Sequence, residues 1–362
     1  MRTRGTIKLA TRGSDLAMRQ ATTVRDALED QHYEVELVEV ETEGDRIRDE
    51  LIQNLGKTGA FVRSLDEKVL DGDVDAAVHS MKDMPTEMPD DLVVAGIPER
   101  GPANDVLITP DGSSLDDLEP ESVVGTSSLR RQAQIRHHRD DLEVEPLRGN
   151  VDTRIEKLLA PALQAEHEAR SEADKERKGN TGNEDFEPEF DETVDDWFDG
   201  LSELKKQALG REIETEYDAI VLAEAGIRRS GLDHYVSFEP LAPDEFVPAA
   251  GQGALAITAT AGETADALNT ALDFPRTRVE TTVERTVLGA LNGGCVAPIG
   301  VHAIVQGEYV RTEVQVFDPE GEDVVQERRD LPIETHARAA REFADNLSEK
   351  GAAEFVAAAR EQ

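Results

Sequence analysis

Short aliphatic runs alternate with amphipathic stretches along the first hundred residues of the chain. Residues 16–30 and 61–72 repeat apolar side chains at helical spacing, and Ser14 or Asp15 can cap the first of these helices. The runs between and after them are rich in Val, Ile, Leu and Ala, as in buried strands. We predict strands at residues 6–11, 35–42, 75–80 and 92–97. This alternation favours a mostly parallel sheet covered by helices on both faces.

A second series of strands and helices follows, and it contains an interruption. Strands are predicted at residues 105–109 and 217–223, and a helix begins near Arg154. Between this helix and the second strand, residues 161–216 form an acidic, turn-rich insertion with few β-branched residues. We expect a solvated, partly disordered surface segment, with room for a short helix around residues 201–214.

The last ninety residues have a different pattern. Residues 277–294 predict a helix that ends at glycines, and residues 302–330 alternate apolar and polar side chains between Gly-containing turns. Residues 336–362 are helical in pattern. We therefore predict a separate, smaller α+β domain at the C-terminus.

Charge changes the picture of the protein's surroundings. The chain has 77 Asp and Glu against 39 Lys and Arg, a formal net charge of −38. Such a surface repels nucleic acid and anionic membranes, so neither partner is expected. The excess of acids suits a cytoplasm at high salt, where repulsion is screened, and indicates a halophile. Cys295 is the sole cysteine, which excludes an intrachain disulfide, and no long apolar run occurs. We expect a cytoplasmic protein.

Against this acidic background, one stretch is densely basic. Residues 125–139 read GTSSLRRQAQIRHHR, with Ser128 among the candidate caps of a helix that starts near Arg130 and Arg131. A helix N-terminus attracts anions, so two arginines there call for a bound anion or for nearby acids. Both explanations remain open. Similar cations follow other strands or lie in Gly-rich loops; they are Arg12 with Ser14, Lys57, Arg148, Arg154 and Arg229.

Loops at the carboxyl ends of parallel strands converge on one crevice, so this recurrence predicts a pocket for several carboxylates or phosphates. Lys82 and Asp83 follow the strand that ends at Ser80, and Asp83 there is either a turn former or a stabiliser of positive charge. His79 beside them is expected to be a packed histidine. No nucleotide-binding loop and no metal-ligand spacing is present.

Cys295 lies in the sequence LNGGCVAPIG, where a lone cysteine is commonly a small buried apolar residue. The flanking glycines and Pro298 instead favour an exposed loop whose sulfur can form a covalent bond. The residues alone leave both interpretations open.

Seven segments, in this order, resemble the hydroxymethylbilane synthase (porphobilinogen deaminase) family. They are TRGSDLAMRQ, HSMKDMP, GTSSLRRQAQ, LRGNVDTR, AGIRR, PAAGQGA and NGGCVAPIG. The resemblance implies two doubly wound α/β domains, similar to the halves of type II periplasmic binding proteins, and a third α+β domain. The implied domains are residues 1–103 with 252–272, residues 104–251, and residues 273–362.

The resemblance also implies a monomer and a dipyrromethane cofactor joined to Cys295 through a thioether. Four porphobilinogen units would be added to it, each losing ammonia, before water releases 1-hydroxymethylbilane. Asp83 would be the catalytic carboxylate that assists loss of the amine. The cofactor's carboxylates would be held by Lys82, Ser128, Arg130, Arg131 and Arg148. The substrate's carboxylates would be held by Arg12, Ser14, Lys57, Arg154 and Arg229.

Two departures from the family pattern concern one loop. Gln53 stands where the family often has a lysine, and the loop around Lys57 reads GKTGAF. An alternative function is a non-enzymatic, periplasmic-binding-protein-like module for a polycarboxylate, which would need neither Cys295 nor Asp83. A cytosolic regulator is disfavoured, because no basic helix-turn-helix pattern is present.

Overall fold

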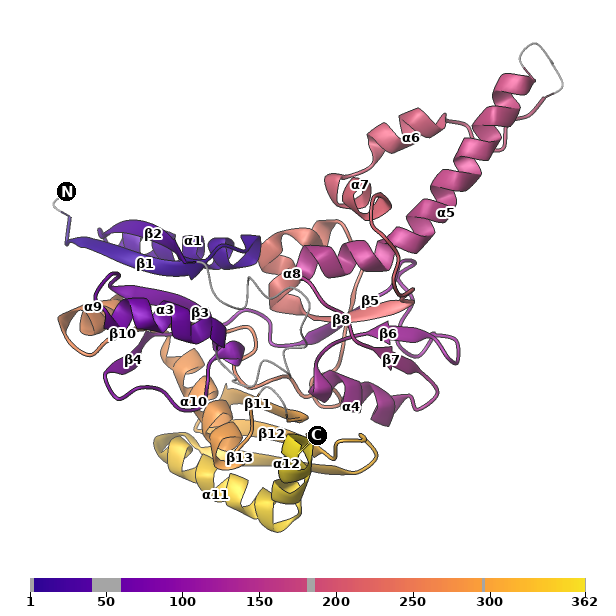
Figure 1. Ribbon diagram of the computed structural model, residues 1–362. Coiled ribbons are helices and arrows are strands. Elements are labelled where there is room, and N and C mark those ends of the chain that lie inside the picture. Colours follow the sequence, from indigo (N-terminus) through magenta and orange to yellow (C-terminus); the bar gives the residue numbers. More distant parts are fainter. Residues whose placement is uncertain (1–2, 41–59, 181–185, 295–296, 362) are drawn as a thin grey trace.

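The computed structural model describes residues 3–40, 60–180, 186–294 and 297–361, and its chain forms three sheets (Figure 1). The first sheet has the strand order β2-β1-β3-β10-β4, in which β10 alone runs against its neighbours. Its strands are β1 (Thr6–Arg12), β2 (Glu34–Val40), β3 (Ala76–Ser80), β4 (Leu92–Gly96) and β10 (Leu255–Thr260). The sequence prediction of a mostly parallel sheet is confirmed.

Helices cover both faces of this first sheet. α1 (Asp15–Asp30) and α9 (Glu263–Leu272) pack on one face, where Leu28 and Leu268 contact the strands in one apolar cluster. α3 (Ala60–Leu70) lies on the other face through Leu65 and Val69. Ser14 caps α1 as predicted, because its side chain accepts a hydrogen bond from the Ala17 amide at 3.4 Å.

The second sheet repeats the arrangement of the first, with strand order β7-β6-β8-β5-β9 and β5 antiparallel to β8 and β9. Its strands are β5 (Asp105–Ile108), β6 (Val123–Gly125), β7 (Glu143–Glu145), β8 (Ala219–Ala223) and β9 (Glu239–Pro240). Its helices are α4 (Leu129–His138), α5 (Val151–Gly179), α6 (Val194–Gly200), α7 (Glu203–Leu209) and α8 (Glu224–Ser230). The predicted pair of similar α/β units is confirmed.

The acidic insertion is more ordered than the sequence indicated. The helix α5 is 29 residues long and includes Pro161 in its interior. α6 and α7 return beside it, and the three helices form an arm that projects from the body (Figure 1). Trp197 is buried against Leu163 and Ala208 in a small apolar cluster. The expectation of a partly disordered segment is therefore wrong for the described part, because strong helix formers such as Ala, Glu, Lys and Arg prevail over the turn residues there.

The C-terminal part is the predicted α+β unit. Three antiparallel strands pack against helices around one core that includes Val287, Val314 and Phe343. Its elements are α10 (Pro275–Ala290), β11 (Ile299–Gln306), β12 (Tyr309–Phe317), β13 (Val324–Pro332), α11 (His336–Glu349) and α12 (Ala352–Glu361). Three single 3-10 turns complete the described chain; they are η1 (Met81–Asp83), η2 (Leu232–His234) and η3 (Ile333–Thr335). No helix in the described ranges is long and apolar enough to cross a membrane.

Two chain segments cross between the α/β units: residues 97–104, between β4 and β5, and residues 241–254, between β9 and β10. A buried glutamate binds both of these crossing segments to the C-terminal unit. Glu284 of α10 accepts hydrogen bonds from Arg100 Nη1 at 2.7 Å, from the Gly251 amide at 2.7 Å and from the Ala303 amide at 2.8 Å. The crossing segments lie so close that a Cβ on Gly253, where φ is +83°, would lie 2.6 Å from the Gly101 carbonyl oxygen. Only glycine fits there.

Candidate active site

The carboxyl-terminal edges of the two α/β sheets face each other. At Gly226 of α8, an added Cβ would lie 3.5 Å from Val151 at the start of α5 and 4.0 Å from Leu16 at the start of α1. Loops that follow β1, β7 and β8 therefore meet across the two units. This arrangement brings segments that carry predicted anion-binding residues to one region, called the crevice below, as expected for open parallel sheets.

The turn after β3 presents Lys82 and Asp83 at this crevice. The Met81 amide donates to the Ala254 carbonyl oxygen at 3.0 Å, and the Met81 side chain is buried. Lys82 is half-buried and Asp83 is exposed. Gly251, with φ +76°, packs on this turn so closely that a Cβ there would lie 2.8 Å from Met81 Cγ. These contacts fix the backbone of the turn that carries the Lys82 and Asp83 side chains.

Lys82 belongs to a cluster of cations that act on one another. Burial lowers the pKa of Lys82, and the positive charges of Arg131 and Arg154 lower it further, against the opposing effect of Asp83 and Asp105. Burial and the charge of Arg131 also lower the pKa of Arg154 to about 10. Cations that are desolvated and repel one another gain stability when anions bind between them. This cluster is therefore suited to an anionic ligand.

The adjacent arginine pair at the start of α4 has a counter-ion within the protein. Arg130 Nη1 lies 2.7 Å from Asp105 Oδ2, and Arg131 Nη2 lies 2.8 Å from Asp105 Oδ1; all three side chains are buried. Burial raises the pKa of Asp105, but the two guanidinium groups outweigh it and hold that pKa well below its usual range. A bound anion is thus not needed to explain the pair, and bridging to a nearby acid is the explanation that the structure supports.

Comparison with known proteins decides the family. Residues 7–170 and 202–267 match the family model described as "Porphobilinogen deaminase, dipyromethane cofactor binding domain". Residues 279–349 match the family model described as "Porphobilinogen deaminase, C-terminal domain". The chain belongs to the porphobilinogen deaminase family. Members of this family are transferases that act on porphobilinogen. The first match is interrupted at residues 171–201, the outer part of the α5–α7 arm.

Individual relatives agree with this assignment. A probable porphobilinogen deaminase of Halobacterium salinarum is 54% identical, with 98% of each chain covered. A porphobilinogen deaminase of Sulfurimonas denitrificans is 36% identical, with 97% of this chain and 96% of the relative covered. Among solved structures, the methionine-binding protein MetQ superposes with a TM-score of 0.37 and 13% identity, covering 74% of this chain and 89% of that one.

The other residues that the family resemblance assigned to ligands have varied surroundings. Ser128 caps α4, since its side chain accepts a hydrogen bond from the Arg131 amide at 3.5 Å. Arg12 ends β1 and is half-buried, as is Arg148 in the loop before α5. Arg229 donates to the Gly253 carbonyl oxygen at 2.5 Å, and burial lowers its pKa. Their roles toward ligands remain predictions.

Three positions singled out in the sequence, Gln53, Lys57 and Cys295, lie outside the described residues. The predicted packed histidine is confirmed: His79 Nε2 lies 2.9 Å from Asp66 Oδ1 and 3.0 Å from Thr258 Oγ1, and all three side chains are buried.

Sequence reasoning missed the buried polar residues that support the site. Asp105 binds the arginine pair and also accepts from Gln252 Nε2 at 2.8 Å. Gln252 Nε2 donates to the Ala103 carbonyl oxygen as well, at 2.6 Å, which links the two crossing segments. Asp105 opens a strand of otherwise apolar residues, and an acid at such a position was the one available signal. Its partners are distant in sequence and could not be identified from it.

Proposed function

We propose that the protein condenses four porphobilinogen molecules head to tail, with loss of ammonia, and releases 1-hydroxymethylbilane. The observation that carries this proposal is the desolvated cationic cluster of Lys82, Arg131 and Arg154 beside the exposed carboxylate of Asp83. Every pyrrole in the growing chain bears two carboxylates. A protein of net charge −38 therefore needs a local cationic lining to bind it.

The described residues fit a dipyrromethane group. Its carboxylates would offset the burial and the mutual repulsion that lower the pKa values of Lys82 and Arg154. Lys82 and Arg154 would hold it, with Arg148 and Ser128 from the neighbouring loops, and the Cys295 sulfur would bond to it. When bound, the group supplies the pyrrole carbon to which the first substrate is joined. Arg130 and Arg131 would act through Asp105, because Arg130 Nη1 already donates to Asp105, Gln134 and the Val247 carbonyl oxygen. Likewise, all three guanidinium nitrogens of Arg131 donate to Asp105 or to the Val221 carbonyl oxygen.

In this proposal, Asp83 is the catalytic carboxylate that assists loss of the amine. In each cycle the C–N bond of the substrate's aminomethyl group breaks, and the nitrogen leaves as ammonia. A C–C bond then forms to the terminal pyrrole carbon, which loses its proton. Positive charge develops on the substrate pyrrole as the amine leaves, and a fixed carboxylate nearby lowers the energy of that state. Arg12, Ser14, Lys57, Arg154 and Arg229 would bind the incoming carboxylates.

Replacing Asp83 with Asn tests that role. Asp83 is exposed and makes no salt bridge within the described ranges, so D83N is expected to fold normally. Turnover should fall by roughly 10²-fold or more, on the scale of lost general acid–base catalysis. Retention of near-normal turnover in D83N, with cofactor loading unchanged, would show that another group stabilises the developing charge.

The mass of the intact, denatured protein tests the proposal as a whole. We expect an excess equal to two linked pyrrole units, absent from a Cys295→Ala variant. If the purified protein carries no excess, it is incubated with porphobilinogen and measured again. A mass gain that depends on Cys295 supports the enzyme. No gain after incubation would favour the alternative, a binding module for polycarboxylates.

We also propose that the protein acts as a monomer in the cytoplasm. One chain supplies both walls of the crevice, and the acid-rich composition suits a high-salt interior. Light scattering during size-exclusion chromatography in concentrated KCl should give the mass of one chain, 39.6 kDa, and twice that mass would contradict the monomer.

A further inference from the structure

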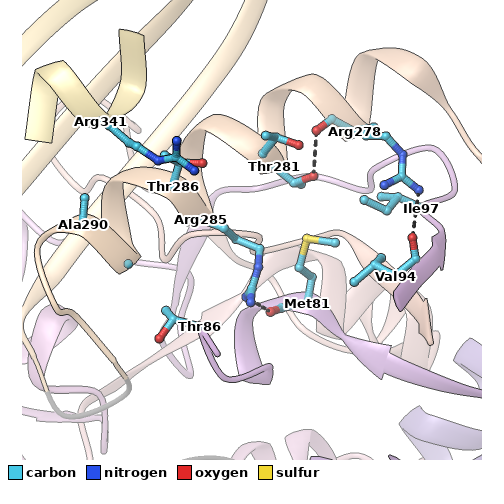
Figure 2. A pocket seen from close by; sticks show the side chains of 12 residues that line it. Met81, Thr86, Val94, Ile97, Arg278, Thr281, Arg285, Thr286, Ala290 and Arg341 are labelled. Carbon is cyan, nitrogen blue, oxygen red and sulfur yellow. Dashed lines mark hydrogen bonds between the residues drawn. The ribbon is translucent and has the colours of Figure 1, made fainter. Parts of the chain in front are cut away.

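A cavity lined by arginines lies behind the Lys82–Asp83 turn, between the first α/β unit and the C-terminal unit. Its volume is about 560 Å³, within the range of small-molecule sites. It is lined by Met81, Thr86, Val94, Ile97, Arg278, Thr281, Thr282, Arg285, Thr286, Gly289, Ala290 and Arg341 (Figure 2). Met81 forms part of its wall, whereas neither Lys82 nor Asp83 does. The cavity is therefore distinct from the crevice between the two α/β units.

The composition of this cavity differs from that of the rest of the chain. None of its 12 lining residues is acidic, although 77 of the 362 residues are Asp or Glu. Three are arginines and four are threonines, of which Thr281 already donates its hydroxyl to the Thr277 carbonyl oxygen at 2.8 Å. In so acidic a protein, a cavity that gathers cations and excludes carboxylates has the charge complementary to an anion.

Two of the three arginines are held in place by the protein, Arg278 by the Asp273 carboxylate and backbone carbonyl oxygens and Arg285 by backbone carbonyl oxygens. Arg278 Nε donates to Asp273 at 2.8 Å, and its Nη2 donates to the Val94 carbonyl oxygen at 3.2 Å. Arg285 donates to the carbonyl oxygens of Met81 and Met84 at 3.4 and 3.3 Å, and to that of Pro85. These contacts fix both guanidinium groups on the cavity wall before any ligand arrives, which lowers the entropic cost of binding.

The third arginine is available to a ligand. Arg341 of α11 is exposed and makes no hydrogen bond or salt bridge with any residue that the structure describes. Figure 2 shows its side chain extending from α11 towards Thr286 of α10. The Thr286 hydroxyl likewise makes no hydrogen bond within the described chain. A guanidinium and a hydroxyl at one side of a cationic cavity can together bind a carboxylate or phosphate group.

We propose that this cavity binds a small molecule bearing two or more carboxylate or phosphate groups, with Arg341 and Thr286 as direct ligands. Arg285, held by backbone carbonyl oxygens, supplies fixed positive charge elsewhere on the wall, whereas the charge of Arg278 is offset by Asp273. This binding site is additional to the proposed condensation of porphobilinogen, since it lies outside the crevice that contains Asp83.

Isothermal titration calorimetry with citrate, and separately with pyrophosphate, tests the proposal. The protein is titrated at the lowest KCl concentration that keeps it folded, because salt screens such contacts. Arg341→Gln should weaken binding of at least one probe roughly tenfold, the scale of one charge-assisted hydrogen bond. Thr286→Val, which keeps the side-chain shape, should weaken the same probe several-fold. Which probe responds distinguishes carboxylate from phosphate ligands.

Arg338→Gln is the matched control. Arg338 lies on the same helix, is exposed, and pairs with Glu342 at 3.7 Å outside the cavity. Its replacement removes the same charge, so a general electrostatic effect would weaken binding equally in both variants. Affinity for both probes that is unchanged in Arg341→Gln, or lowered to the same extent in Arg338→Gln, would overturn the proposal. In that case the anions bind only in the crevice or over the surface.

Discussion

Asp105→Asn is expected to destabilise the fold strongly. The side chain keeps its size and stays buried, but it loses the charge that faces Arg130 and Arg131. Two guanidinium groups would then lie within the protein without a carboxylate. The asparagine amide can also direct donors towards them. Removing one partner of a buried ion pair costs about 3–5 kcal/mol, because the remaining charge is left desolvated.

The pH dependence of stability follows from the same contacts. The guanidinium groups hold the pKa of Asp105 well below its usual range in the folded protein, despite burial. The unfolded carboxyl group, with an ordinary pKa of about 3.9, binds a proton first as the pH falls. The ion pair therefore stabilises the fold fully above that pH, and this contribution is lost on acidification. The Asn variant should lose less stability than the unmodified protein between neutral and acidic pH.

Denaturant unfolding in low and high KCl measures this prediction. The loss in Asp105→Asn should persist at high salt, because the pair is shielded from solvent ions. Asp26→Asn is the control, since Asp26 pairs with Arg25 at the surface, where the side chains are 60% and 35% exposed. Its effect should stay below about 1 kcal/mol. A loss in Asp105→Asn as small as that of the control, or one that vanishes in salt, would refute the reasoning.

Further predictions concern the cap of α1, the crevice and the arm. Ser14→Ala should lower the free energy of unfolding by about 1 kcal/mol through loss of the helix cap, measured by thermal melting. Arg154→Leu and Arg148→Leu should impair chain assembly, seen as fewer pyrrole additions by mass spectrometry. Carboxylate binding should also weaken at alkaline pH, because burial lowers the pKa of Lys82 and, with the charge of Arg131, that of Arg154 to about 10. The free energy of unfolding should fall as the KCl concentration is lowered. Replacing residues 171–201 with a short linker should reduce this dependence on salt. If the KCl concentration at which half of the protein unfolds stays the same, the arm has no role in salt adaptation.

Much of the fold could be predicted because its signals are local. The strands at residues 75–80 and 105–109 are short apolar runs, and the α1 cap follows from a single serine before a helical pattern. The insertion was mispredicted for a local reason as well. Its turn residues and its acidity outweighed the helix propensity of α5 in the sequence reasoning, and packing around Trp197 could not be anticipated.

The site was predictable in outline only. Strand ends with arginines indicated a crevice, but the partner of each arginine depends on contacts between distant segments. Asp105 lies 25 residues before Arg130. The need for glycine at Gly253, within GQGA, is visible only in the structure, where the crossing segments approach each other closely. Glu284 of the C-terminal unit likewise binds Arg100 of a crossing segment as well as the Ala303 amide of its own unit. Such contacts leave no periodic trace in the chain.

The buried carboxylates provide a physical basis for dividing the arginines of the crevice. Arg130 and Arg131 face Asp105, so their charge is largely offset within the protein, and their removal should damage the fold. Arg154 donates from Nε to the Gly149 carbonyl oxygen at 2.8 Å and makes no salt bridge with a described carboxylate. A carbonyl satisfies a donor without neutralising the charge. Arg154 therefore retains a positive charge that a ligand can offset, and its loss should reduce binding while leaving the fold intact.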